Sequence, residues 1–177
     1  SDLYELRKNG VAQSIIRAHT SGATVMGICG GYQMMGQEVS DPLPVEGEIE
    51  RLPGLGLLPI ATQMLGEKVT RQVKFSFLNS DAICEGYEIH MGDTQPVNGS
   101  LHSTLNILED GTAEGYYLNE RCFGTYIHGI LDNGAFVDFL LEPFAEKISD
   151  EPFDFKKYKE EQYNKLADHV RSHVNMD

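Results

Sequence analysis

The stretch Gly27-Ile28-Cys29-Gly30-Gly31 decides the fold that this sequence predicts. It closes a short apolar run, 24–28, that suits a buried parallel strand, and it opens a helical stretch that reaches about Gln37. A nucleophile set among glycines, after a strand and before a helix, is the pattern of a nucleophile elbow. The glycines favour this interpretation, because a sharp turn leaves little room for neighbouring side chains.

Two interpretations of Cys29 stay open from spacing alone. In the first, the helix N-terminus stabilises a Cys29 thiolate, and the backbone N–H of Gly30 points at a developing oxyanion. In the second, the segment is a tight turn that buries an inert cysteine. An inert role, as core or turn residues, is expected for Cys84 and Cys122.

The composition is that of one globular domain, and it argues against several functions. The 177 residues are 41% hydrophobic and 23% charged, with a net charge of −13. Nucleic acid is not expected as a partner, because phosphate contacts need clustered basic side chains. No apolar run approaches the roughly 20 residues of a membrane helix and no signal-peptide core is present, so a cytoplasmic protein is expected. The cysteines lack metal-ligand spacing, so no metal site is expected.

Helices are expected at both ends of the chain, around a series of short strands. The opening helical pattern, 1–20, breaks at Asn9-Gly10, and closing helices are expected at 135–147 and 155–174. Alternating or short apolar segments predict strands at 55–61, 69–77, 87–91, 104–109, 114–118 and 122–128. This arrangement predicts an α/β domain of three layers with a mixed sheet.

A cysteine nucleophile needs a base, and the chain offers six histidines. His128 is the favoured candidate, because it ends an apolar segment and open α/β sheets gather catalytic groups at the ends of strands. His90 lies in another strand-like segment, and a core histidine is the alternative for both. Surface, cap or loop positions are expected for the remaining four, which are His19, His102, His169 and His173.

Five segments occur in an order that is specific when they are taken together. They are Gly27–Met34, Asp41-Pro42 with Val45-Glu46-Gly47, Gly54-Leu55-Gly56-Leu57-Leu58, Gly86-Tyr87-Glu88-Ile89-His90-Met91-Gly92 and Gly124-Thr125-Tyr126-Ile127-His128-Gly129. In this order they resemble the C-terminal class I glutamine amidotransferase domain of cobyric acid synthases. The likeness runs from the first residue to about Asp132.

The resemblance implies a class I glutamine amidotransferase-like (flavodoxin-like) fold with a mostly parallel mixed central sheet. It also implies a glutaminase that supplies ammonia for ATP-dependent amidation of corrin carboxylates in cobalamin biosynthesis. The implied partners are glutamine, an upstream synthetase domain of the same chain and a corrin bound at that domain. No G-x-x-x-x-G-K-[ST] motif occurs in residues 1–177, so ATP and Mg²⁺ are expected in the synthetase domain and no cofactor in this one.

The same resemblance assigns roles to individual residues. Cys29 would be the nucleophile, His128 the general base and later acid, and Gly30 an oxyanion donor. The residues assigned to holding the substrate glutamine are Gln33, Tyr87, Glu88 and His90. Because side chains alternate along a strand, Tyr87 would face away from the two residues Glu88 and His90, and not all three can reach one ligand.

Two departures from the family pattern bear on activity. Ile130 stands where ordinary class I glutaminases carry a glutamate, so Asp132, Glu88 or a group of the partner domain would have to orient His128. The family's first strand and its glycine-containing loop, which supplies the second oxyanion donor, would precede Ser1. Residues 1–177 are therefore expected to be a fragment of a glutaminase domain that hydrolyses glutamine slowly or not at all when alone.

Two other functions stay open at this point. One is the glutaminase of a related system, such as cobyrinic acid a,c-diamide synthase or a cell-wall glutamate amidating complex. The other is a non-catalytic binding domain of the same fold. The segment 88–92 favours the cobyric acid synthase, and the presence of Cys29, Gln33 and His128 argues against a non-catalytic role.

Overall fold

A computed structural model describes residues 2–45, 47, 50–78, 80–97, 104–147 and 155–174. The chain divides into two compact units, 1–129 and 130–177, and each is described by itself. The cysteine motif and His128 both belong to the first unit. Two residues that the sequence singled out, Glu46 and His102, lie outside the described residues.

Two helices open the chain, as the sequence predicts. α1 covers Asp2–Lys8 and α2 covers Val11–Thr20. The break falls at Gly10, whose φ of 82° is a conformation that glycine adopts without strain. Arg7 ties α1 to the loop after β3, because its Nη1 donates to the carbonyl oxygen of Gly54 at 2.9 Å.

Three strands form a small sheet in the order β1-β9-β8. β1 is Val25–Ile28, β9 is Cys122–Thr125 and β8 is Tyr116–Asn119. β1 and β9 run parallel, with Gly27 opposite Gly124, and β8 and β9 are antiparallel. The parallel pair sets the strand that precedes Cys29 beside the strand that leads to His128.

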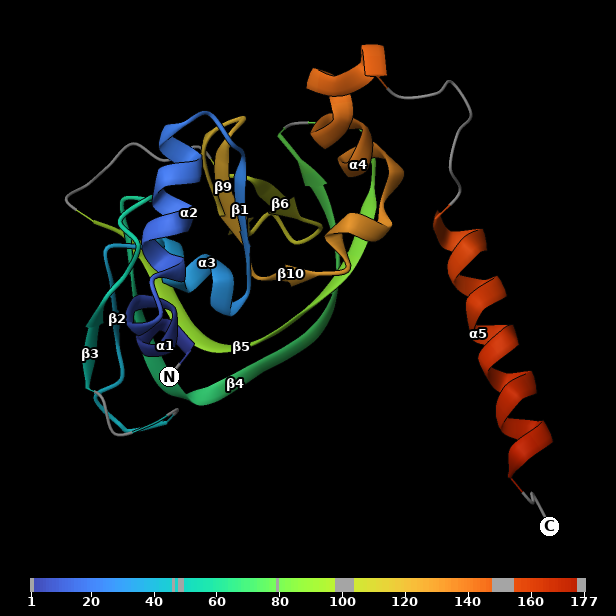
Figure 1. Ribbon diagram of the computed structural model, residues 1–177, viewed down its shortest axis with the longest axis horizontal. Helices are drawn as coiled ribbons and strands as arrows, with labels where there is room; N and C mark the ends of the chain where they lie inside the picture. The colour runs from blue at the N-terminus through green and yellow to red at the C-terminus, as the bar shows by residue number, and fades with distance from the viewer. Residues whose placement is uncertain are drawn as a thin grey trace. The chain divides into compact units, whose positions relative to one another are not determined.

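The larger sheet has seven strands among the described residues and runs β10-β5-β4-β2-β3, with β6 and β7 joined to it through β4. Its longest members, β4 (Ile60–Phe77) and β5 (Cys84–Pro96), pair antiparallel and form the curved ribbon seen in Figure 1. The shorter strands are β2 (Glu38–Ser40), β3 (Arg51–Pro53), β6 (Asn106–Leu108), β7 (Ala113–Glu114) and β10 (Ile127–His128). The edge of β5 therefore carries β10, and with it His128.

The α/β class with mixed sheets is confirmed, but strand directions differ from the expected mostly parallel central sheet. Among the described residues, β1 with β9 and β2 with β4 are the parallel pairs, and the other pairs are antiparallel. The connections give the reason. β4 is joined to β5, and β8 to β9, by only a few residues, and so short a connection reverses the chain, whereas a parallel pair needs a longer crossover.

Helix α3 (Gly30–Met35) lies between the two sheets and contacts strands of both. Tyr32 and Met35 enter a buried core that is shared by the two sheets. The other buried members of this core are Leu58, Ile60, Tyr116, Cys122 and Tyr126. The helix that follows Cys29 is therefore fixed from both sides.

The segment 54–58 caps the C-terminal end of α3. Backbone N–H groups of this segment donate to the carbonyl oxygens of Met34 and Met35 at 2.8 to 2.9 Å. Those carbonyls would otherwise lack partners at the helix end. The strand predicted at 55–61 is therefore wrong in its first part, because its N–H groups are committed to α3 and β4 begins only at Ile60.

Two segments predicted as single strands are each divided between the two sheets. Residues 114–118 split at Gly115, whose φ is 73°, into β7 of the larger sheet and β8 of the smaller one. Residues 122–128 split at Tyr126 into β9 and β10 in the same way. Both single-strand predictions are wrong, because an apolar pattern shows that a segment is buried but not that it changes sheets.

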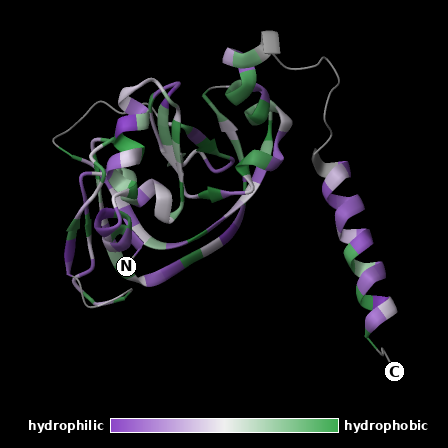
Figure 2. Ribbon diagram, in the orientation of Figure 1, coloured by the Kyte–Doolittle hydropathy of each residue, from purple (hydrophilic) through white to green (hydrophobic). Residues whose placement is uncertain are grey.

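The second unit contains α4 (Gly134–Leu141) and α5 (Phe155–His173), with 3₁₀ turns at Ile130–Asp132 and Glu142–Lys147. The two closing helices are thus confirmed, the first one shorter than predicted. Figure 2 shows α4 as largely hydrophobic and α5 as largely hydrophilic. Within the described ranges, no helix combines the length and the apolar character needed to cross a bilayer.

The close packing of α3 on β1 gives a testable stability prediction. A Cβ added at Gly27 would lie 2.6 Å from Tyr32 Cα and from Met35 Sδ. Gly27→Ala is therefore expected to lower the free energy of unfolding by about 1–3 kcal/mol, measured as a lower urea midpoint. Gly66→Ala is the matched control, because its Cβ would meet only Leu43 Cδ1 at 4.0 Å. Equal midpoints for the two variants would contradict this account of the packing.

Candidate active site

Cys29 occupies the turn between β1 and α3 in a strained backbone conformation. Its φ of 53° and ψ of −117° are rarely adopted by non-glycine residues and cost on the order of 1–3 kcal/mol. The turn is held on both sides. The N–H of Cys29 donates to the carbonyl oxygen of Thr125 at 2.8 Å, and its carbonyl oxygen accepts from the N–H of Gln33 at 3.1 Å. This strained strand-to-helix turn is the geometry that the elbow motif predicts.

His128 ends β10, and its ring packs against an aromatic neighbour. It stacks on Tyr87, with ring centroids 5.0 Å apart and an angle of 7° between the planes. Tyr87 is also its partner across the β10–β5 pair, so the two side chains share one face of the sheet. The Nε2 of His128 is buried and has no hydrogen-bond partner in the part of the chain that the structure describes. A buried nitrogen of this kind is available to a group that enters the site.

Strand β5 brings Cys29 and His128 to neighbouring positions. The Cys29 thiol donates to the carbonyl oxygen of Ile89, with 3.5 Å between Sγ and O. His128 pairs with Tyr87, two residues earlier in the same strand. The structure thus places both predicted catalytic residues at one edge of β5, although almost a hundred residues of sequence separate them.

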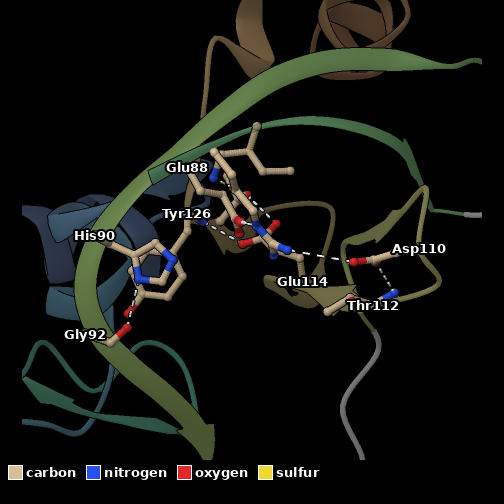
Figure 3. A network of polar contacts seen from close by, with 10 residues as sticks. Glu88, His90, Gly92, Asp110, Thr112, Glu114 and Tyr126 are labelled. Carbon is tan, nitrogen blue, oxygen red and sulfur yellow. Dashed lines mark hydrogen bonds and ion pairs between the residues drawn. The ribbon is translucent and has the colours of Figure 1, made fainter. Parts of the chain in front are cut away.

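The residues predicted to hold glutamine fall into two groups, because side chains alternate along β5. Tyr87 lies on the face that carries the histidine of β10. Glu88 and His90 point to the opposite face, as Figure 3 shows. There Glu88 forms an ion pair with Arg71, and the His90 ring stacks on Tyr126 with 3.7 Å between centroids. The separation expected from strand alternation is therefore present in the fold.

A cavity of about 520 Å³ lies on the face of β5 that carries Glu88 and His90. Its wall also includes Arg71, Glu114 and Tyr126. Burial raises the pKa of Tyr126 to about 12, so its hydroxyl stays protonated at neutral pH. The combination of charged groups of both signs with a phenol suits a small polar molecule.

Gln33 is buried in α3, and its amide is held by Tyr126. Its Nε2 donates to the Tyr126 hydroxyl at 3.3 Å, and that hydroxyl lies 2.5 Å from Thr94 Oγ1. The amide fits against β5 only because residue 92 is a glycine. A Cβ on Gly92 would overlap the Gln33 amide and would lie 2.9 Å from the Tyr126 hydroxyl. A larger residue at position 92 would therefore displace the Gln33 amide or the Tyr126 ring.

The carboxylates that sequence reasoning offered for orienting His128 both have cationic partners. Glu88 is ion-paired with Arg71 on the far face of β5. Asp132, in the second unit, lies 2.5 Å from Lys159 Nζ. The described contacts of the His128 ring are instead with an aromatic side chain, Tyr87.

Glu114 is a residue of this site that sequence reasoning missed. Its carboxylate is buried and accepts three hydrogen bonds, from Tyr126 N–H at 2.6 Å, Thr125 Oγ1 at 2.6 Å and Asn106 Nδ2 at 2.7 Å. Burial raises the pKa of the Glu114 carboxyl, and the three hydrogen bonds act in the opposite direction. The available signal was an acidic residue at the start of the strand-like segment 114–118, since buried carboxylates are rarely left without partners.

The remaining cysteines and histidines lie where the sequence places them. Cys84 and Cys122 are 2% and 0% exposed, so both are core residues. His19 Nδ1 lies 3.1 Å from the carbonyl oxygen of Ala23, just after α2. The other two described histidines are exposed on α5 and stack on one another, and they are His169 and His173.

Comparison with known proteins places this arrangement in a family. Residues 1–136 match a family described as the CobB/CobQ-like glutamine amidotransferase domain. The chain is 66% identical to a cobyric acid synthase of Bacteroides fragilis and 64% identical to one of Phocaeicola vulgatus, each over 176 residues. Both alignments cover 99% of this chain and 36% of the relative, so the chain spans little more than a third of these curated relatives.

A solved crystal structure of a glutamine amidotransferase has a similar fold. Its TM-score to this chain is 0.52 at 14% sequence identity, and the match covers 77% of this chain and 69% of the other. At this identity the likeness concerns the fold alone. The fold is that of the glutamine amidotransferases, in agreement with the sequence-based expectation.

The different burial of the three cysteines predicts different reactivity. Burial raises the pKa of the Cys122 thiol to about 11 and also raises the pKa of Cys84, so both stay protonated at pH 8. Cys29 is half-buried. Iodoacetamide at pH 8 is therefore expected to modify Cys29 first, and the other two only after urea is added, as peptide mass spectrometry would show. Prior modification of Cys84 or Cys122 in the native protein would contradict this assignment.

Proposed function

The chain belongs to the CobB/CobQ-like glutamine amidotransferase family, and we propose that it hydrolyses glutamine with Cys29 as nucleophile and His128 as base. The observation that carries the proposal is the convergence of both residues on β5. The strained elbow puts Cys29 Sγ against the Ile89 carbonyl, and β10 sets His128 against Tyr87. The buried Nε2 of His128 has no partner among the described residues, which supports a role as proton acceptor.

In the proposed reaction, Cys29 Sγ attacks the side-chain amide carbon of glutamine while His128 Nε2 takes the thiol proton. The amide oxygen becomes an oxyanion that the backbone N–H of Gly30 stabilises, since the first N–H groups of a helix have no partner within it. When the C–N bond breaks, His128 returns the proton to nitrogen and ammonia leaves. Water then attacks the thioester with His128 as base, which releases glutamate and restores the thiol.

The residues expected to hold glutamine lie on opposite faces of β5, so Tyr87 cannot share one ligand with Glu88 and His90. Tyr87 lies on the His128 face and would contact the reacting end of glutamine. Glu88 and His90 line the 520 Å³ cavity on the other face, where Arg71 adds a positive charge. Charges of both signs in that cavity suit a small polar molecule, distinct from the glutamine that Tyr87 would contact. Gln33 is assigned to the substrate pocket through the hydrogen bond from its amide to the Tyr126 hydroxyl, which also contacts Thr94.

We also propose that the ammonia serves ATP-dependent amidation of corrin carboxylates, as the name of the relatives indicates. Relatives at 54 to 66% identity are named cobyric acid synthase, which favours this pathway over the related diamide synthase or a cell-wall amidating complex. The chain covers 36% of those relatives. ATP, Mg²⁺ and the corrin are accordingly assigned to a synthetase partner rather than to residues 1–177.

Replacing either member of the proposed dyad should abolish glutaminase activity. Cys29→Ser and His128→Ala are each expected to lower kcat for glutamate release from L-glutamine by at least about 1,000-fold in the full-length protein. Cys29→Ser should also prevent covalent labelling by diazo-oxo-norleucine, which peptide mass spectrometry would detect. His169→Ala, an exposed histidine on α5, is the matched control and should keep full activity. Turnover retained by either dyad variant would refute the mechanism.

The stacked Tyr87 ring predicts a smaller and distinct effect. Tyr87→Leu removes the aromatic contact that holds the His128 ring. Because such a contact contributes about 0.5–1.5 kcal/mol, kcat is expected to fall by about 2- to 12-fold. Tyr87→Phe keeps the ring and should remain close to the wild type. The role assigned to the stacking is wrong if the phenylalanine and leucine variants have the same kcat.

A further inference from the structure

We infer that Glu114 is a positioning residue for the glutaminase reaction, because it fixes the short segment that joins the Cys29 turn to His128. The inference rests on the proposed function, since it concerns the placement of those two residues. Glu114 is the last residue of β7. Its carboxylate contacts Thr125, the last residue of β9, and Tyr126, which lies between β9 and β10.

The carboxylate holds two consecutive residues at once. Oε2 accepts from the hydroxyl of Thr125 at 2.6 Å, and Oε1 accepts from the backbone N–H of Tyr126 at 2.6 Å. Asn106 Nδ2 donates to Oε2 at 2.7 Å and to Thr125 Oγ1 at 3.1 Å, which closes a small buried ring of contacts. Figure 3 shows Glu114 aimed at the backbone of Tyr126. Neither residue can move without breaking a hydrogen bond to a buried carboxylate.

Thr125, one of the two held residues, is linked to both proposed catalytic groups. The carbonyl oxygen of Thr125 accepts the N–H of Cys29 at 2.8 Å, so it anchors the strained turn. The hydroxyl of Thr125 accepts the N–H of Ile127 at 3.0 Å, and Ile127 precedes His128 in β10. A shift at Thr125 would therefore displace the nucleophile and the base relative to one another.

A carboxylate is suited to this position because the strand changes sheets here. Tyr126 belongs to neither β9 nor β10, so no ladder supplies an acceptor for its buried N–H. Glu114 supplies that acceptor from a neighbouring strand that crosses between the sheets at Gly115. Another carboxylate that lines the cavity, Glu88, forms an ion pair with Arg71. Glu114 instead accepts hydrogen bonds from Thr125 and Tyr126, where the chain passes from β9 to β10.

The test compares three variants in the full-length protein by glutamate release from L-glutamine. Glu114→Ala is expected to lower kcat on the order of 100-fold with little change in KM, because a displacement of about 1 Å between reacting groups has an effect of that size. Glu114→Gln keeps an acceptor for the Tyr126 N–H and should be at least about ten-fold more active than the alanine variant. Leu3→Ala, a buried residue of α1 that is 2% exposed, should lower Tm without lowering kcat.

A second variant keeps the inference falsifiable if the alanine variant does not fold. Thr125→Val removes the hydroxyl that joins Glu114 to Ile127 but leaves the Tyr126 bond. It should lower kcat by about ten-fold and slow the labelling of Cys29 by diazo-oxo-norleucine, while Thr125→Ser restores both.

The outcomes separate this inference from the proposed function. If Cys29→Ser abolishes turnover but Glu114→Ala and Thr125→Val keep the wild-type kcat, the positioning role alone is overturned. Equal losses in Glu114→Ala and Glu114→Gln that follow the decrease in Tm would assign Glu114 to folding only, which also overturns it. If Cys29→Ser keeps full turnover, the glutaminase mechanism itself is wrong.

Discussion

The buried carboxylate of Glu114 joins the two places where the chain passes from one sheet to the other. At Gly115 and at Tyr126 a strand leaves its ladder, and a backbone group that leaves a ladder inside a protein needs another partner. Glu114 accepts from both residues at the second crossing, Thr125 and Tyr126. Hydrogen bonds to a charged group contribute about 1.5–3 kcal/mol each, which offsets part of the cost of burying the carboxylate, and burial still raises the Glu114 pKa. The relative placement of the two sheets depends on this junction.

Close packing of α3 between the sheets supplies the second constraint. Glycine at positions 27 and 124 lets Tyr32 approach the β1–β9 pair, because a Cβ at either position would overlap it. The segment 54–58 then closes the far end of α3 through its backbone N–H groups. With the helix fixed at both ends, the backbone of Cys29 is held in a conformation that it would not adopt alone. The cost of that strain is thus offset by packing that lies outside the turn.

Strand β5 organises the site because its edge and its two faces have different neighbours. Its edge pairs with β10 and meets the thiol of Cys29. One face carries Tyr87 against His128, and the other carries Glu88 and His90 toward the cavity. A single strand therefore contacts the proposed dyad with its edge and one face, and lines the cavity with its other face. This arrangement explains how one continuous segment, 86–92, can serve both.

The sequence by itself determined the elements whose cause is local. The elbow at Cys29 follows from glycines that permit a sharp turn, and the break at Gly10 from a glycine that adopts positive φ without strain. The opposed faces of β5 follow from the alternation of side chains along a strand. These features were predicted because the residues that cause them are neighbours in the chain. The two-sheet arrangement, the crossings at Gly115 and Tyr126 and the carboxylate that fixes them were decided only by the tertiary structure. Each depends on partners distant in sequence, and a hydrophobic pattern records that a residue is buried but not which residue it meets.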